Sequence, residues 1–211
     1  MRLLVIVLFA SLISCSKQVP NEFVVYDNEF VRAKTNNMSG AILYNEKGQN
    51  LLGRYNRGGF TLNLSSLPKH NAVIIEAELL IHDSWDGNSK EGNIDGPDIW
   101  KMLADEKIVV NASFSNARCE PLYCVYQSYP ANYGTVNNPP KTDAKQFFPG
   151  KCWNQKTGTT TMYRIIKTIS HSSNKLSIGC MDELVQTNTD DPLCDESWSL
   201  SGLRVKTILV K

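Results

Sequence analysis

The chain has 211 residues, of which 42% are hydrophobic and 20% are charged. This composition is typical of a folded globular domain and excludes a disordered chain or a polytopic membrane protein. Its 22 basic and 21 acidic residues give a formal net charge of +1. The chain therefore lacks the excess of positive charge that would hold it on nucleic acid or on an anionic lipid surface.

The first segment along the chain is a predicted export signal. Arg2 is followed by a run of about ten apolar residues, which is too short to span a bilayer. The next four residues, Leu12-Ile13-Ser14-Cys15, resemble the bacterial lipobox. This resemblance implies a signal peptide over 1–14, acyl chains on Cys15 and a lipidated tether over 15–22. The protein would then be extracytoplasmic and held at the cell envelope, and the membrane would be reached only through the lipid. The alternative is an ordinary signal peptide and a secreted protein.

Residues 23–211 are expected to form a single all-β domain. No segment has the periodicity of a long helix, and short β-rich runs are separated by Asn, Gly, Asp and Pro. The expected strands include Phe23–Tyr26, Ala41–Tyr44, Phe60–Leu64, Val73–His82, Ile99–Leu103, Ile108–Phe114, Met162–Ile169, Leu176–Met181 and Trp198–Val210. So many strands in a neutral, exported chain predict a jelly-roll-like β-sandwich.

One segment interrupts the succession of strands. Tyr126–Lys156 is rich in aromatic residues and Pro and carries no strand pattern. A stretch of this length is too long for a simple connection between two strands. We expect either a functional loop or an insertion that covers one sheet.

The cysteines after Cys15 all lie in the C-terminal half. An exported chain meets an oxidising compartment, so disulfides are expected. Cys119 and Cys124 flank a short loop, and Cys180 and Cys194 flank a connection between two predicted strands. These spacings predict the pairs Cys119–Cys124 and Cys180–Cys194 and leave Cys152 free. A zinc site is the competing interpretation, but the sequence has no C-x-x-C and no nearby His pair.

Several short motifs occur in an order that resembles a known type of module. His82–Asn88 reads HDSWDGN, Gly96–Trp100 reads GPDIW, Asn111–Asn116 reads NASFSN, Gln127–Pro130 reads QSYP and Asp195–Trp198 reads DESW. Together they are similar to an extracytoplasmic jelly-roll β-sandwich module of large bacterial surface proteins. The chain departs from that pattern after Trp198, where the Gly and Asp of the module are missing. The resemblance implies a fold and an extracytoplasmic location, and no reaction.

The acidic segment 83–98 is the first candidate site. Its oxygen-bearing side chains include Asp83, Asp86, Asn88, Asp95 and Asp98, with glycines between them. Calcium takes six to eight oxygen ligands around a tightly curved backbone, so this segment predicts a calcium site. Asp195 and Glu196 would add ligands if the last strand pairs with Val73–His82. The alternative is that the acidic side chains cap turns by accepting hydrogen bonds from backbone amides.

Aromatic and carboxylate side chains supply two further candidates. Trp85 lies in a polar loop and Trp153 in the long insertion, so both are expected to be exposed and to contact a sugar ring. Trp100 and Trp198 lie within strand patterns and are expected in the core.

Glu76 and Glu78 share one face of a strand, as paired carboxylates of a glycoside hydrolase could. The solvated side of an amphipathic strand explains these two residues as well.

The sequence therefore predicts a cell-envelope or surface module for binding or adhesion. We expect it to be stabilised by calcium, with a glycan or another surface protein as ligand and no nucleic acid partner. The alternative is a small jelly-roll glycan hydrolase or lyase that uses Glu76, Glu78 or the acidic segment.

Overall fold

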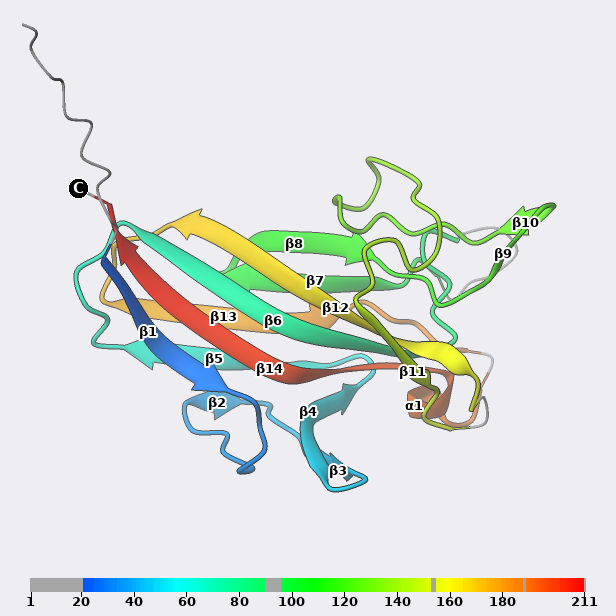
Figure 1. Ribbon diagram of the computed structural model, residues 1–211, viewed down its shortest axis with the longest axis horizontal. Coiled ribbons are helices and arrows are strands. Elements are labelled where there is room, and N and C mark those ends of the chain that lie inside the picture. The colour runs from blue at the N-terminus through cyan, green and yellow to red at the C-terminus, as the bar shows by residue number, and fades with distance from the viewer. Residues whose placement is uncertain (1–20, 90–95, 153–154, 188, 211) are drawn as a thin grey trace, which may run out of the picture.

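The computed structural model describes residues 21–89, 96–152, 155–187 and 189–210. It is nearly all β, with antiparallel sheets stacked face to face (Figure 1). The first sheet contains β11 (Gln146–Pro149), β12 (Thr157–Ser170), β6 (Ala72–Asp83), β14 (Glu196–Leu209), β4 (Gln49–Tyr55) and β3 (Leu43–Glu46), in that order. β1 (Asn21–Asn28) joins this sheet by pairing with the second half of β14. The all-β sandwich predicted from the sequence is confirmed.

The second sheet has five strands. Its order is β2 (Met38–Ser39), β5 (Gly59–Ser65), β13 (Lys175–Asp182), β7 (Ile99–Ala104) and β8 (Lys107–Ser113). A separate short hairpin is formed by β9 (Cys119–Glu120) and β10 (Tyr123–Cys124). Helix α1 (Pro192–Asp195) is a single turn that immediately precedes β14.

The period-two pattern of β6 explains its central place in the first sheet. Val73, Ile75, Leu79 and Ile81 alternate along the strand and are fully buried, because successive side chains of a strand point to opposite faces. Along most of its length β6 is flanked by β12 on one side and β14 on the other. The register places Glu196 opposite Asp83, so the C-terminal end of β6 and the beginning of β14 bring two acidic residues together.

Trp198 lies in the middle of the core between the two sheets. Its ring centroid is 4.7 Å from that of Tyr55 in the same sheet. The rings of Trp100 and Phe60, from the second sheet, lie at 5.8 and 6.3 Å. The indole N–H donates to the Asp182 carboxylate at 2.7 Å. The expectation that Trp100 and Trp198 belong to the core is confirmed.

The long segment between β10 and β12 is anchored by the buried side chain of Gln127. Its Oε1 accepts hydrogen bonds from the backbone N–H of Lys141 at 2.9 Å and of Ser115 at 3.2 Å. Its Nε2 donates to the carbonyls of Tyr129 and Thr142, both at 3.1 Å. Because one amide side chain replaces several ladder hydrogen bonds, this segment is ordered with little regular structure. Its last part differs from the expected loop, since Gln146–Pro149 forms the edge strand β11.

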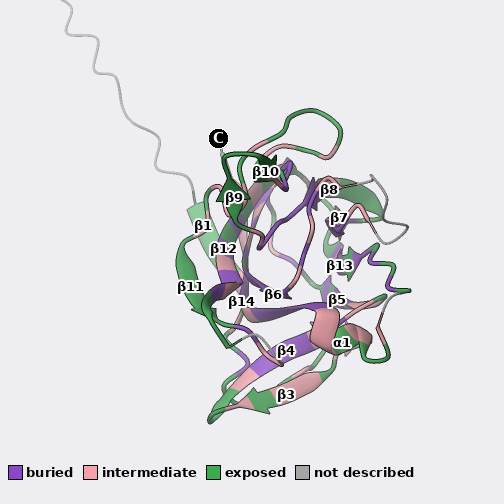
Figure 2. Ribbon diagram, turned by 90° about the vertical axis from the view of Figure 1, so that its right-hand side faces the viewer, coloured by how far each residue is buried: buried purple, intermediate pink, exposed green. Residues whose placement is uncertain are grey.

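The two ends of the sandwich differ. β1 begins and β14 ends at one end, whereas the β9–β10 hairpin and much of the long segment lie at the other (Figure 1). Figure 2 views the molecule from that second end, and buried backbone lies between the sheets while β9 and β10 are exposed. We call this second end the loop end. Among the described residues, no helix is both long and apolar enough to cross a membrane.

Candidate functional site

Trp85 is not an exposed sugar-binding residue, contrary to the expectation. Its side chain is 0% exposed, it meets the Phe114 ring edge-on at 6.3 Å, and its indole N–H donates to the Ser197 carbonyl at 3.0 Å. The polar residues around it in the sequence concealed its burial, because the residues that cover it come from distant segments. The other predicted ligand residue, Trp153, lies outside the described residues.

Among the described residues of the predicted calcium site, Asp83 and Asn88 have separate hydrogen-bond partners. Asp83 accepts a hydrogen bond from the backbone N–H of Lys151 at 2.9 Å. Asn88 accepts from the Ser113 hydroxyl and donates to Asn137 Oδ1 at 2.7 Å. Asp95 lies outside the described residues.

Within the described ranges, no group of three or more His, Cys, Asp or Glu side chains is arranged to hold a metal ion. Asp98 accepts a hydrogen bond from the backbone N–H of Asp86. Asp83 and Asp98 thus accept from amides that are distant in the sequence, so these two contacts are tertiary contacts rather than caps of local turns.

Asp98 and Glu196 form a buried carboxyl pair, with only 1% and 4% of the residue exposed. Burial raises the pKa of both side chains, and the charge of Asp98 raises that of Glu196 further. Glu196 accepts from Gln186 Nε2 at 2.5 Å, and a hydrogen bond between the Asp98 and Glu196 side chains offsets part of the rise in the pKa of Asp98. Two such carboxyls are stable together only when a proton or a cation neutralises part of their charge.

Of the two predicted disulfides, one is present in the structure and one is not. Cys119 and Cys124 are bonded as predicted. The predicted pair Cys180–Cys194 is wrong, because Cys194 is bonded to Cys152. Cys180 is a free, fully buried thiol in β13. The alternation of β13 directs Cys180 into the core, whereas Cys194 lies on α1, close to the end of the long segment that carries Cys152.

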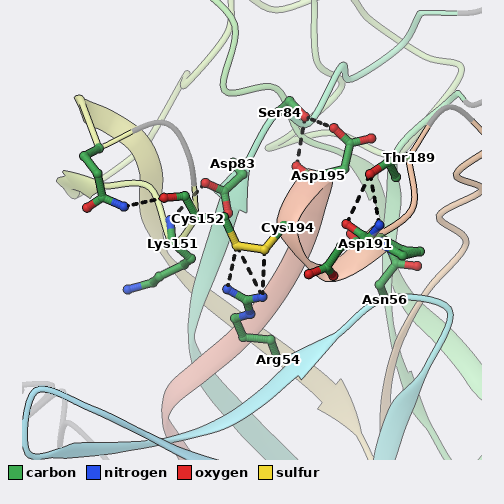
Figure 3. The surroundings of a disulfide bond; sticks show 12 residues. Arg54, Asn56, Asp83, Ser84, Lys151, Cys152, Thr189, Asp191, Cys194 and Asp195 are labelled. Carbon is green, nitrogen blue, oxygen red and sulfur yellow. Dashed lines mark hydrogen bonds between the residues drawn. A yellow bond between two sulfur atoms is a disulfide. The ribbon is translucent and has the colours of Figure 1, made fainter.

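The guanidinium of Arg54 lies against the Cys152–Cys194 disulfide (Figure 3). Its two terminal nitrogens are 3.6 and 3.7 Å from Cys152 Sγ, and one of them is 4.0 Å from Cys194 Sγ. The backbone N–H of Lys151, the residue before Cys152, donates to Asp83. The disulfide therefore joins the end of the long segment to α1, and Arg54 of β4 and Asp83 of β6 make contacts beside it.

The loop end carries a hollow lined by tyrosines. It has a volume of about 780 Å³ and is lined in part by Tyr123, Tyr126, Tyr133, Asn88 and Asn137. The side chains of Tyr123 and Tyr126 are 68% and 42% exposed, and the neighbouring Leu122 is fully exposed. The Cys119–Cys124 disulfide closes the hairpin that presents Leu122 and Tyr123. We call this concavity the tyrosine hollow; its exposed rings are those of tyrosines, which were not among the ligand residues predicted from the sequence, and Trp85 does not line it.

A second concavity lies on the outer face of the first sheet. This groove of about 690 Å³ is lined by Leu80, Met162 and Phe148 together with polar residues that include Glu78. Lys151 and Glu46, which also line it, form an ion pair at 2.7 Å.

The two carboxylates of the hydrolase alternative lie on the same outer face as this groove. Arg164 at 2.7 Å and Lys206 at 3.1 Å pair with Glu76. The hydrogen bond from Arg164 is the largest cause that lowers the pKa of Glu76, and the contact with Lys206 lowers this pKa further. Glu78 accepts a hydrogen bond from the Ser201 hydroxyl at 2.9 Å. Glu76 is thus held in its ionised form by two cations, which is the opposite of what a general acid requires.

No protein-family model matches the sequence, and no curated protein matches it at a significant level. Solved structures with similar folds include dimeric latent PorU from Porphyromonas gingivalis, at 8% identity and a TM-score of 0.37 over 71% of this chain. The present chain spans only 10% of that protein.

Two carbohydrate-binding modules are also similar. One is CBM6cm-2 from Cellvibrio mixtus lichenase 5A, solved with cellotriose, at 13% identity and a TM-score of 0.37 over 87% of this chain and 97% of that one. The other is TmCBM27, described for specific mannan recognition, at 9% identity and a TM-score of 0.40 over 89% and 98%. None of these values assigns a ligand or an activity to the present chain.

Proposed function

We propose that the chain is a glycan-binding module and that the tyrosine hollow is its binding site. The observation that carries the proposal is the pair of exposed rings, Tyr123 and Tyr126, beside the amides of Asn88 and Asn137. A tyrosine ring presents an apolar face with a polar hydroxyl, which suits the C–H face and hydroxyl rim of a sugar. The disulfide-closed hairpin holds one of the rings in place before binding, which lowers the entropic cost of association.

The place of the hollow fits a module held at the cell envelope. The predicted lipid anchor, Cys15, precedes β1 in the chain but lies outside the described residues. β1 begins at the end of the sandwich opposite the β9–β10 hairpin (Figure 1). We propose that acylated Cys15 anchors the domain by its N-terminal end, so that the tyrosine hollow faces away from the membrane.

Binding titrations with neutral oligosaccharides test the glycan proposal. A glycan array would select ligands, and isothermal titration would measure their dissociation constants. Tyr123→Ala and Tyr126→Ala should each weaken binding roughly tenfold, the effect of losing one ring contact of about 1.4 kcal/mol. The matched control is Phe23→Ala, an exposed aromatic residue on β1, which should leave affinity unchanged. Absence of any binding glycan, or an equal loss in the control, would overturn the proposal.

The same glycans separate a binding module from the hydrolase alternative. Prolonged incubation with the protein should release no reducing ends or unsaturated products, because Glu76 is paired with Arg164 and Lys206. If cleavage appears and is abolished by Glu76→Gln or Glu78→Gln, the chain is an enzyme and the outer face of the first sheet carries its site.

Membrane fractionation tests the anchor. Cys15→Ala should move the protein from the membrane to the soluble fraction, because each buried acyl CH₂ contributes roughly 0.8 kcal/mol to membrane affinity. Mass spectrometry of the wild-type protein should find an acylated N-terminal Cys15. An unmodified N-terminus that begins after Cys15 would show a secreted protein instead.

We also propose calcium as a stabilising ion of the acidic segment, a prediction that no contact in the structure tests. Its support is the buried carboxyl pair Asp98–Glu196, whose combined charge needs a neutralising proton or cation. Backbone carbonyls, amides and water would have to complete the six to eight oxygens that calcium takes. Calcium at a hundredfold excess over its dissociation constant should add about 2.7 kcal/mol of stability, and Asp98→Asn should remove this gain. If calcium and chelator give the same melting temperature, a proton alone neutralises the pair.

A further inference from the structure

A second cavity at the loop end is rimmed by basic side chains. It has a volume of about 380 Å³ and is formed where the C-terminal end of β6 lies near the segment after Asn116 and the beginning of β12. Arg118, Lys141 and Lys156 all line it, and each comes from a different segment of the chain. We call it the basic cavity. It shares no lining residue with the tyrosine hollow.

Two of these cations, Arg118 and Lys141, are not neutralised by a carboxylate of the described chain. Lys141 is half-buried, and burial together with the positive charge of Arg118 lowers its pKa. Its ammonium lies over Gly158, where an added Cβ would be 3.5 Å from Nζ. Gathering like charges at a partly buried site raises the free energy unless an anion accompanies them.

Two acidic residues, Asp83 and Asp86, line the same cavity but do not form ion pairs with Arg118 or Lys141. Asp83 accepts a backbone hydrogen bond from Lys151, and the charges acting on its pKa are those of Arg54 and Lys151. Burial and the nearby charge of Asp195 raise the pKa of Asp86. Neither carboxylate forms an ion pair with Arg118 or Lys141, and the charges that shift the pKa values of Asp83 and Asp86 are those of other groups.

We propose that the basic cavity binds an oxyanion, namely a carboxylate, sulfate or phosphate group. Arg118 supplies planar N–H donors suited to two oxygens of such a group, and Lys141 supplies a point charge. A volume of 380 Å³ is at the small end of ligand sites, which suits one charged group with the unit that carries it. The oxyanion is either a free inorganic ion or a substituent of an acidic glycan.

Isothermal titration at constant ionic strength tests this site. The probes are sodium sulfate, sodium phosphate and a trisaccharide of uronic acids, each compared with sodium chloride and with a neutral trisaccharide, because chloride controls for general screening. At least one oxyanion should bind with a saturable, one-site isotherm. Binding of sulfate or phosphate alone identifies a free ion, and binding of the uronate trisaccharide alone identifies an acidic glycan.

Variants locate the site. Lys141→Met and Arg118→Ala should each weaken oxyanion binding roughly tenfold, since each removes a charge-assisted contact. Lys145→Met is the matched control, because Lys145 is exposed, pairs with Asp143 and does not line the cavity. Arg118 is exposed, so its removal leaves the fold intact. An equal loss in Lys145→Met, or oxyanion effects no larger than those of chloride, would overturn the proposal.

Single variants test the two proposed sites separately. Tyr123→Ala should weaken neutral glycans and leave sulfate, phosphate or uronate binding at the basic cavity unchanged. Lys141→Met should do the reverse. Loss of both activities in Tyr123→Ala would show that the basic cavity is not a separate site.

Discussion

At the scale of single residues, the buried carboxyls decide how the protein responds to pH. Asp98 and Glu196 both have a raised pKa because burial disfavours their charged forms. When no cation is bound, the native protein therefore keeps protons that the unfolded chain releases near pH 4. Their favourable contribution is complete below the unfolded pKa and is lost as pH rises through the native pKa.

Melting curves between pH 5 and pH 9 should show this loss. Stability should fall with rising pH by about 1.4 kcal/mol per pH unit for each retained proton, until the native pKa is passed. Asp98→Asn should flatten the profile and raise the melting temperature at alkaline pH, since the amide removes one charge from the pair. Asp143→Asn, at an exposed position, should leave the profile as in the wild type. A wild-type profile that is flat or rises over this range would contradict the raised pKa values.

At the scale of elements, the two disulfides close loops of very different length. Cys119–Cys124 spans a separation of 5 residues and Cys152–Cys194 spans 42. A disulfide stabilises mainly by restricting the unfolded chain, and this effect grows with loop length. The first bond shapes the hairpin of the tyrosine hollow, whereas the second ties the end of the long segment to α1.

Replacing each pair by alanine separates these roles. Cys152→Ala with Cys194→Ala should cost about 4 kcal/mol of stability, and Cys119→Ala with Cys124→Ala about 2 kcal/mol. The smaller loop should matter more for ligand affinity, because Tyr123 lies on its hairpin. Denaturant unfolding and glycan titration measure the two effects. Equal stability losses, or a larger effect of the long-range bond on glycan affinity, would refute this division.

At the scale of the whole molecule, Trp198 connects the two sheets. It lies on β14, and its ring meets residues of both sheets. Its N–H reaches Asp182, which also accepts from the backbone N–H groups of Arg57 and Gly58 at 2.8 and 3.1 Å. This one side chain thus contacts β4, β5, β7 and β13.

Trp198→Phe should destabilise the fold by about 2–4 kcal/mol, because it leaves a cavity and removes the hydrogen bond to Asp182. Phe147→Leu, at an exposed position on β11, should change stability by less than about 0.5 kcal/mol. Denaturant unfolding of both variants measures the difference. A loss below 1 kcal/mol in Trp198→Phe would mean that the two sheets do not depend on this contact.

Most of the strands could be predicted from local pattern, although β4 and β11 were not. In Val73–His82 one face is entirely apolar, and the structure buries this set as β6: Val73, Ile75, Ala77, Leu79 and Ile81. The tight spacing of Cys119 and Cys124 likewise predicted their bond. These features depend on neighbours in the chain, since a two-residue period or a short loop closure needs no knowledge of the rest of the fold.

The partners of residues far apart in the chain were decided only by the tertiary structure. Trp85 is surrounded by polar residues in the sequence and is nevertheless buried against Phe114. Cys194 bonds Cys152 rather than Cys180, because β13 directs Cys180 into the core and α1 lies beside the end of the long segment. Burial and pairing of this kind depend on which strands become neighbours, and the pairing of non-local strands follows from the packing of the whole core rather than from any local pattern.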